Sequence, residues 1–261
     1  MPDRQSPDRL VRLIGIGVGH PDHITHEAAA ALHDTDVVFT VDKGEAKRGL
    51  NELRDLICRR HGGPGLRTVE VHEPERDRAP ADYAAEVTRW HGARGAVWEQ
   101  ALREHLPPGG RGAFLVWGDP SLYDSTLRIL DGVASRVAVS IEVVPGITSI
   151  QVLAARHRIP LNTVGGAVHV TTGRRLGEDA ATQDTLVVML DGASAWAQLD
   201  GDVWDIWWGA HLGGADEILV SGRLGEVAAR IDAAKREARA RVGWVMDVYL
   251  LRRRCARATA P

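Results

Sequence analysis

The chain has 261 residues, of which 44% are hydrophobic and 26% charged, the proportions of a globular protein with one large domain or two modest ones. Its formal net charge of −3 provides no basic field that would attract nucleic acid or an acidic membrane surface. No apolar run is long enough to span a bilayer and the polar N-terminus has no signal-peptide core, so we expect a cytoplasmic protein without membrane or nucleic-acid partners.

The first half of the chain alternates predicted strands with predicted helices. Buried-strand patterns occur at Val11–Gly17, Asp36–Asp42, Leu66–Val71, Ala113–Pro120 (with its turn) and Val139–Gly146. Helical patterns occur at His26–Leu32, Ala46–Arg60, Tyr83–Ala101 and Ile147–His157. This alternation is typical of βαβ units that build a parallel sheet.

The second half contains more strands and fewer helices. Strand patterns occur at Ala167–Thr172, Thr185–Leu190, Asp202–Trp208, Glu217–Gly222 and Val242–Leu251, with helices near Ser194 and at Leu224–Arg241. This change predicts a second α/β domain with a mixed sheet. We expect the boundaries to be residues 10–157 for the first domain and 158–255 for the second.

Three turns in the first half have unusual chemistry. They are Gly15–Asp22 (GIGVGHPD), Trp117–Ser125 (WGDPSLYDS) and Val143–Ser149 (VVPGITS). Each follows a predicted strand, and ligands of parallel sheets bind beyond the carboxyl ends of the strands. Glycine allows tight turns and a close approach of the backbone to a ligand. Three such turns on one sheet predict a ligand site.

The glycines of the first turn alone would also fit a dinucleotide-dependent oxidoreductase. Asp42, at the end of the second strand, lies where a ribose-binding acid would be expected. The sixth position of the glycine motif, however, is His20, and no Gly-Lys-Ser/Thr follows, which excludes a P-loop. The other two turns favour a different cofactor.

Together the three turns resemble, in order and spacing, the sequence signatures of the tetrapyrrole (corrin/porphyrin) methylases. The runs Ile159–Leu161, Thr185–Leu190 and Gly213–Val227 resemble the second domain of that family, so the resemblance extends from about Val11 to Leu251. It implies a two-domain α/β architecture, with a parallel-sheet N-terminal domain, a mixed-sheet C-terminal domain and the active site in the cleft between them. It also implies S-adenosylmethionine as cofactor, a small-molecule tetrapyrrole substrate and a homodimer.

Within the family, the stretch Val41–Arg54 resembles the deacetylating members. This implies methylation of precorrin-5 at C-1 with expulsion of the acyl group as acetate, in cobalamin biosynthesis. A methylase with another acceptor, which in this family includes nucleic acid and protein, remains an alternative, as does a degenerate module that binds a ligand without turnover.

The resemblance also implies a set of cofactor-binding residues. They are Val18, Trp117, Gly118, Asp119, Leu122, Thr148, Ser149, Met189, Leu190 and Gly213. Family members commonly carry Pro-Gly-Asp in the first turn, where this chain has Val18, Gly19 and His20. Methyl transfer from a sulfonium depends mainly on alignment, and the macrocycle supplies the nucleophile, so no catalytic Cys or Ser is expected.

The substrate carries many carboxylates, so we expect cations beside the site. The candidates are Lys43, Lys47 and Arg48, after the second strand, and Arg174 and Arg175, after the first strand of the second domain. Deacetylation further needs a base that assists water. The catalytic candidates are Asp119, His20 and Asp42, with Asp22 as a further polar group.

His20, His23 and His26 recur at intervals of three residues, which raises the question of a metal site. Pro21 interrupts the start of this segment, and the segment spans a turn and the entry to a helix. Zinc sites usually add Cys or carboxylate ligands in a fixed geometry. The sequence therefore predicts no metal.

Overall fold

The computed structural model describes residues 9–41, 48–72, 74, 77 and 82–254; of residues 48–50 and 83–84 it describes the backbone only. The chain divides into two compact units. Unit 1 comprises Met1–Gly17 and Pro21–Thr148, and unit 2 comprises Val18–His20 and Ser149–Pro261. The predicted domain boundary, after residue 157, lies one helix (Ser149–His157) further along the chain than the division after Thr148. The predicted boundary remains a proposal that limited proteolysis can test.

Unit 1 contains a five-stranded parallel sheet. Its strands are β1 (Arg9–Gly15), β2 (Val37–Val41), β3 (Arg67–Val71), β4 (Arg111–Val116) and β5 (Val139–Val144). They lie in the order β3-β2-β4-β1-β5, and every pairing is parallel. The carboxyl ends of all five strands therefore lie at one edge, with β1 in register between β4 and β5.

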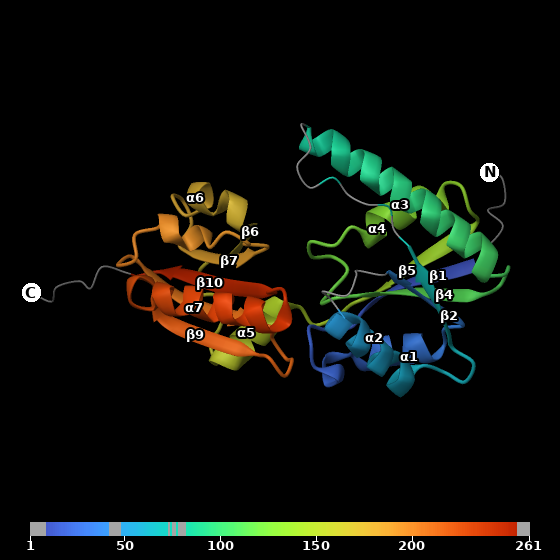
Figure 1. The fold of residues 1–261 in the computed structure, drawn as a ribbon, viewed down its shortest axis with the longest axis horizontal. Helices are drawn as coiled ribbons and strands as arrows, with labels where there is room; N and C mark the ends of the chain where they lie inside the picture. Colours follow the sequence, from blue (N-terminus) through green and yellow to red (C-terminus); the bar gives the residue numbers. More distant parts are fainter. Residues whose placement is uncertain (1–8, 42–47, 73, 75–76, 78–81, 255–261) are drawn as a thin grey trace, which may run out of the picture. The chain divides into compact units, whose positions relative to one another are not determined.

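Helices cover both faces of this sheet. Helices α1 (His26–His33) and α2 (Arg48–His61) lie on one face, and α3 (Tyr83–His105) and α4 (Thr126–Ala134) lie on the other (Figure 1). Thr25 caps α1, because its Oγ1 accepts a hydrogen bond of 3.0 Å from the backbone N–H of Ala28. Since both faces are buried, the central strands are almost continuously apolar.

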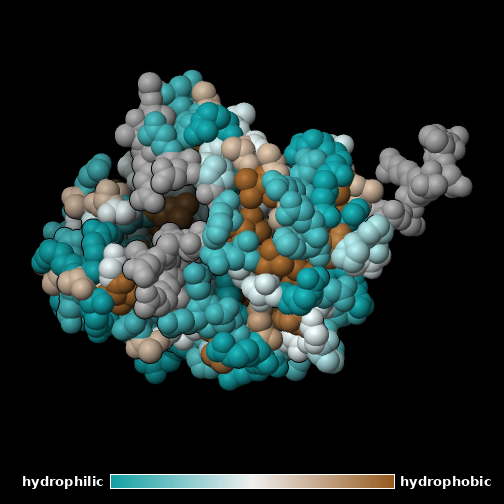
Figure 2. Space-filling model, turned by 45° about the vertical axis from the view of Figure 1, so that its right-hand side comes forward, coloured by the Kyte–Doolittle hydropathy of each residue, from teal (hydrophilic) through white to brown (hydrophobic). Residues whose placement is uncertain are grey.

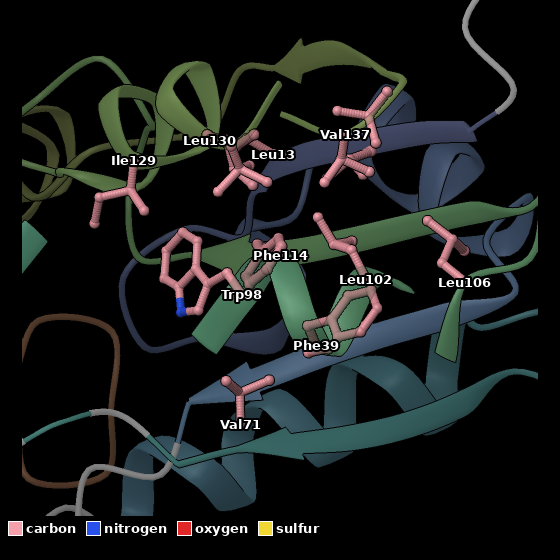
Figure 3. Packing of buried hydrophobic residues seen from close by; sticks show 14 of the residues in the cluster. Leu13, Phe39, Val71, Trp98, Leu102, Leu106, Phe114, Ile129, Leu130 and Val137 are labelled. Carbon is pink, nitrogen blue, oxygen red and sulfur yellow. The ribbon is translucent and has the colours of Figure 1, made fainter. Parts of the chain in front are cut away.

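Successive residues of β1 alternate between the two cores. Leu13 packs in the cluster beneath α3 and α4, whereas Ile14 packs in the cluster beneath α1 and α2. In the first cluster the Phe114 ring lies 4.5 Å from the Trp98 ring and 5.4 Å from the Phe39 ring, centroid to centroid (Figure 3). This aromatic stack packs on the middle of β2 and β4.

Unit 2 contains a five-stranded mixed sheet. Its strands are β6 (His169–Thr172), β7 (Thr185–Met189), β8 (Trp204–Ala210), β9 (Ile218–Arg223) and β10 (Asp247–Arg253), in the order β6-β7-β10-β8-β9. The pair β6 and β7 is parallel, and the other pairs are antiparallel. Both sheets thus have the character that the sequence predicts.

Different helices pack on the two faces of the second sheet. Buried side chains of α6 (Leu176–Asp179), the 3-10 turn η4 (Ala195–Gln198) and α7 (Leu224–Val242) form one cluster with Trp204 and Trp208. On the opposite face, a Cβ added to Gly209 would lie 2.9 Å from Leu153 of α5 (Ser149–His157). Trp204 and Trp208 are therefore core residues, whereas Trp207, on the other face of β8, is half-buried.

Two elements begin later than their local sequence suggests. Aspartate and proline are common at helix starts, yet the Asp119-Pro120 turn opens no helix; α4 begins at Thr126, whose backbone N–H donates to the Asp124 carboxylate at 2.7 Å. The last strand begins at Asp247 and not near Val242, because α7 continues to Val242 and ends at Gly243, which has a φ of 86°. Glycine at this left-handed position is the common stop signal of a helix.

The face shown in Figure 2 is largely hydrophilic, and its hydrophobic residues are gathered in a few places, one of them hollowed. Large apolar side chains that are exposed include Tyr123 and Val143 in unit 1 and Leu190 and Met246 in unit 2. Within the described parts of the chain, no helix combines the length and apolar character needed to cross a membrane.

Candidate functional site

The three turns predicted to form a ligand site begin side by side at one edge of the sheet of unit 1. They follow β4, β1 and β5, which are adjacent strands of the sheet. The backbone N–H of Gly118 donates to the carbonyl of Gly17 at 2.9 Å, and this bridge joins the turn after β4 to the turn after β1. The prediction that the three turns share one sheet edge is therefore confirmed.

The glycines of these turns allow backbone to pack on backbone. A Cβ added to Gly146 would lie 2.1 Å from the carbonyl oxygen of Gly118, and one added to Gly15 would lie 2.6 Å from the backbone nitrogen of Gly146. No side chain fits at such distances, since carbon and oxygen need more than 3 Å. The crossing of the three turns thus requires glycine at both positions.

Asp119 links the second turn to the third. Its Oδ2 accepts from the backbone N–H of Gly146 at 2.8 Å, and its Oδ1 accepts from the backbone N–H of Ser121 at 2.8 Å and from the Ser121 hydroxyl. Burial raises the pKa of Asp119, but the hydrogen bonds from Ser121 and Gly146 outweigh this effect and hold the pKa below its ordinary value. Asp119 is therefore an ionised acceptor that fixes the geometry of both turns.

The other predicted residues of unit 1 are placed around these turns. Trp117 and Leu122 are half-buried beside Gly118, whose φ is 65°. Thr148 is half-buried at the end of the third turn, and Ser149, the first residue of α5, belongs to unit 2. Asp42, Lys43 and Lys47 lie outside the described residues, and of Arg48 the structure describes only the backbone at the start of α2.

In unit 2, the predicted residues lie along one edge of the second sheet. Because β7 and β8 are both antiparallel to β10, and β6 is parallel to β7, the strands β6, β7 and β8 all end at the same edge. Met189 ends β7, and Leu190 follows it with a φ of 55° and a side chain that is 67% exposed. Arg174 and Arg175 follow β6 and are exposed; Arg175 pairs with Asp179 at 3.2 Å.

Three residues of the first glycine turn, Val18, Gly19 and His20, also lie at this edge, because they belong to unit 2 and not to unit 1. A Cβ added to Gly19 would lie 2.4 Å from the carbonyl oxygen of Leu212, in the turn that contains Gly213. Gly213 has a φ of 76°, and its backbone N–H donates to Glu217 at 2.6 Å. The structure therefore brings Val18 and Gly213 into neighbouring segments, while His20 is exposed.

A buried polar network supports the end of β7. Asp191, the residue after Leu190, accepts a hydrogen bond of 2.7 Å from the hydroxyl of Tyr249, and its carbonyl accepts one of 3.1 Å from Lys235. Lys235 also pairs with Asp247 at 3.1 Å, and the Trp208 indole N–H donates to Asp247 at 2.9 Å. Burial raises the pKa of Asp247, although Lys235 opposes the shift.

This network holds the exposed residue Leu190 in a left-handed conformation that non-glycine residues rarely adopt. Asp191 anchors the following turn as well, because its two carboxylate oxygens accept from the backbone N–H groups of Ala193 and Ala195 at 3.1 and 2.8 Å. The strand end thus presents the exposed apolar side chain of Leu190 directly before a turn that Asp191 anchors.

Two buried arginines were missed at the sequence level. Arg54 of α2 and Arg94 of α3 are 6% and 7% exposed and line a cavity next to Trp117. The signal was present in the sequence, because Arg54 falls between Leu50, Leu53 and Ile57 on the apolar face of its helix. Among the described residues, no group of three His, Cys, Asp or Glu side chains is arranged to hold a metal.

Comparison with known proteins identifies relatives along almost the whole chain. Residues 11–228 match the family model of the tetrapyrrole (corrin/porphyrin) methylases. Over 249 residues the chain is 47% identical to the precorrin-6A synthase (deacetylating) of Sinorhizobium sp, which covers 94% of this chain and 95% of that protein.

Solved structures agree with the sequence comparison. A cobalamin synthesis related protein (CobF) from Corynebacterium diphtheriae superimposes with a TM-score of 0.80 at 39% identity, covering 94% of this chain and 98% of that one. The uroporphyrin-III C-methyltransferase of Thermus thermophilus, in complex with S-adenosylhomocysteine, shares the fold with a TM-score of 0.57 at 22% identity, covering 92% of this chain and 91% of that one.

Proposed function

Because the chain belongs to the tetrapyrrole (corrin/porphyrin) methylase family, whose members are S-adenosylmethionine-dependent methyltransferases, we propose that it methylates precorrin-5 at C-1 and releases acetate to give precorrin-6A. The observation that carries this proposal is the 47% identity, over nearly the full length of both chains, to a deacetylating precorrin-6A synthase. The family and the methyltransferase activity predicted from the three turns are thereby confirmed, and an oxidoreductase is not supported.

Each sheet edge, taken by itself, offers groups that fit one part of the cofactor. The turns after β1, β4 and β5 bring glycine backbone together at one sheet edge, which suits the amino-acid end of S-adenosylmethionine, and Leu190 offers an exposed apolar side chain for adenine. When bound, S-adenosylmethionine supplies an electrophilic methyl group. The ten separate cofactor-binding residues predicted from the family resemblance, of which Val18 is the first and Gly213 the last, remain our proposal for this site.

In the proposed reaction the macrocycle attacks with its own electrons. With S-adenosylmethionine bound, its sulfonium would supply the methyl group to ring carbon C-1, and the sulfur would keep the electron pair of the broken C–S bond. Water, deprotonated by a base, then adds to the acyl carbonyl. The C–C bond to the ring breaks, its electron pair goes to the macrocycle that methylation left positively charged, and the acyl group leaves as acetate with its proton passing to solvent. The protein therefore contributes alignment, charge complementarity and a base.

The structure helps to divide the proposed catalytic roles. Both carboxylate oxygens of Asp119 accept hydrogen bonds from neighbouring turns, so we assign Asp119 to positioning. His20 and Asp42 remain the proposed bases that assist water. Arg174 and Arg175 at the edge of the second sheet, together with Lys43, Lys47 and Arg48 after β2, are proposed to bind carboxylates of the substrate.

The test is incubation of the purified protein with precorrin-5 and methyl-labelled S-adenosylmethionine in acetate-free buffer. We expect mass spectrometry to show one methyl group added to the pigment and ring NMR to place the label at C-1. The amount of acetate released should equal the amount of pigment methylated. Methylation without release of acetate would agree with the family assignment and would overturn the deacetylating assignment. Cofactor binding without any methylation would indicate another acceptor or a module that only binds.

We further propose that the protein is a cytoplasmic homodimer, as the family resemblance implies. Light scattering after size-exclusion chromatography tests the dimer directly. A monomeric mass at micromolar concentration would contradict it, and membrane fractionation of expressing cells would test the location.

A further inference from the structure

The carboxylate of Asp191 is buried in unit 2, one residue beyond Leu190. Its Oδ1 accepts a hydrogen bond from the backbone N–H of Ala193 at 3.1 Å. Its Oδ2 accepts from the backbone N–H of Ala195 at 2.8 Å and from the Tyr249 hydroxyl at 2.7 Å. Because donors approach both oxygens, an amide in this place would turn its NH2 group toward one of them. Only a carboxylate of this size satisfies every donor.

The main chain of Asp191 is held as well. Its carbonyl oxygen accepts a hydrogen bond of 3.1 Å from the ammonium group of Lys235. That ammonium group is itself fixed by the Asp247 carboxylate at 3.1 Å and by the Trp196 ring, whose centroid lies 4.6 Å away. Asp191 is therefore held both at its side chain and at its carbonyl group, which leaves the peptide between Leu190 and Asp191 little freedom to turn.

The turn after β6 leaves space for this carboxylate. A Cβ added to Gly173 would lie 2.5 Å from Oδ1 and 2.6 Å from Cγ of Asp191, closer than real Cβ atoms approach other atoms. The φ angle of Gly173 lies outside the left-handed region, so alanine could adopt its backbone conformation. What the structure requires at this position is the absence of a side chain next to Asp191.

Leu190 needs support of this kind. Its φ of 55° is costly for a residue with a side chain, and such a conformation persists only where the surroundings impose it. The Leu190 side chain is 67% exposed, so its own packing contributes little to that constraint. The constraint comes from the next residue, because the contacts of Asp191 fix the peptide that joins the two.

We propose that Asp191 is a positioning residue of the cofactor site, which holds Leu190 in the conformation that receives the adenine of S-adenosylmethionine. This inference rests on the proposed function, in which Leu190 contacts adenine. The buried carboxylate acts through Leu190 and needs no contact with the cofactor. Without it, the backbone of Leu190 relaxes to an ordinary conformation, and binding of the cofactor has to restore the costly one.

The experiment measures the Kd for S-adenosylhomocysteine by isothermal titration of the full-length protein, well below the melting temperature of each variant. Two variants disturb Asp191 in different ways. Asp191→Asn removes an acceptor, whereas Gly173→Ala forces the carboxylate from its position and leaves every hydrogen-bonding group in the protein. Each should raise the Kd about fivefold or more, the cost of restoring a left-handed backbone conformation.

Two matched controls separate positioning from stability. Gly177→Ala in α6 is also a glycine replacement, but its methyl group would meet the Gln198 side-chain oxygen at 3.9 Å, an ordinary contact. Thr171→Val weakens the same sheet, because it removes a buried hydroxyl that donates to Asp179. Both should leave the Kd unchanged, although Thr171→Val lowers the melting temperature.

A second comparison repeats Asp191→Asn in the Leu190→Gly background. Glycine adopts the left-handed conformation at almost no cost, so Asp191→Asn should then raise the Kd less than about twofold. An effect that persists undiminished in this background overturns the proposal, because Asp191 would then act by a route other than Leu190. An unchanged Kd in either folded single variant, Asp191→Asn or Gly173→Ala, overturns it as well.

Thermal melting identifies a variant that does not fold, and the other single variant then provides the test. The titration uses no pigment, so its result does not depend on whether precorrin-5 is the acceptor. A wild-type protein that methylates no precorrin-5 but shows the expected changes in Kd would contradict the proposed reaction and support the role of Asp191.

Discussion

The carboxylate of Asp119, in the turn after β4, accepts a hydrogen bond of 2.8 Å from the backbone N–H of Gly146, in the turn after β5. The two strands are not neighbours, because β1 lies between them. The bond therefore crosses over the end of β1, where Gly15 leaves no room for a side chain. One carboxylate thus fixes the relative positions of three turns that we assign to the cofactor.

Asp119→Asn should destabilise unit 1 in a pH-dependent way. An amide offers one oxygen where the carboxylate offers two, so the bond from Gly146 or from Ser121 is lost, at a cost of about 1–3 kcal/mol. The pKa of Asp119 is lowered in the folded state, so its stabilising effect is present at neutral pH and is lost as the pH falls below the ordinary value of 3.8.

Urea unfolding of both proteins between neutral and acidic pH measures this effect. The difference in unfolding free energy should be largest at neutral pH and should shrink in acid. Asp131→Asn, at an exposed position of α4, is the control and should change little. A difference that stays constant with pH would show that the ionised carboxylate is not what holds the turns together.

Gly146→Ala should disrupt the crossing of the turns. The new methyl group would lie 2.1 Å from the carbonyl oxygen of Gly118, a backbone atom that cannot move away cheaply. We expect a loss of at least about 1–3 kcal/mol, the range for overpacked sites, together with weaker cofactor binding. Gly92→Ala is the matched control: it faces open space on α3 and should stabilise the protein by up to about 1 kcal/mol. Equal melting temperatures for the two variants would refute this account.

Lys235→Met should strongly destabilise unit 2. Lys235 and Asp247 form a pair at 3.1 Å in which each side chain is 8% exposed, so the substitution leaves Asp247 buried without its cation. Breaking a buried pair in this way costs about 3–5 kcal/mol. The pKa of Asp247 is already raised by burial and rises further without Lys235. The loss of unfolding free energy in the variant should therefore grow as the pH rises above 3.8, the ordinary pKa of the group.

A double-mutant cycle checks this prediction. Asp247→Asn in the Lys235→Met background removes the stranded charge and should restore part of the stability. Arg236→Met, on the exposed side of the same helix, should have little effect. If Lys235→Met proves no more harmful than Arg236→Met, the ion pair does not stabilise the fold.

Much of the fold follows from the sequence because local pattern and packing agree. The five apolar runs of the first half became adjacent parallel strands, and Thr25 capped α1, since each feature depends on a few neighbouring residues. The start of α4 was less predictable. Asp119-Pro120 has the local chemistry of a helix start, but Asp119 is used by Gly146, a residue that is close only in the folded chain.

The site was predictable as a set of turns but not as a set of contacts. The family resemblance pointed to Met189 and Leu190, yet the shared edge of β6, β7 and β8 follows from pairing with β10, which the sequence does not encode locally. Arg54 and Arg94 were overlooked because charged residues are normally assigned to the surface. Their positions within apolar helical faces were the available signal.

Leu190→Gly should separate cofactor binding from stability. Leu190 has a φ of 55°, a conformation that costs a non-glycine residue about 1–3 kcal/mol and a glycine very little. Its side chain is 67% exposed, so its removal sacrifices little core packing. The melting temperature should therefore stay equal or rise, measured by calorimetry without ligand.

The same substitution removes the apolar surface proposed to contact the adenine. Burial of a leucine side chain is worth about 1.5–3 kcal/mol, so the Kd for S-adenosylhomocysteine should rise at least about tenfold in isothermal titration. Val164→Gly, at a fully exposed loop position, is the control and should change neither quantity. Unchanged affinity in Leu190→Gly would remove the end of β7 from the cofactor site, because the variant keeps the fold and every backbone group and lacks only the side chain.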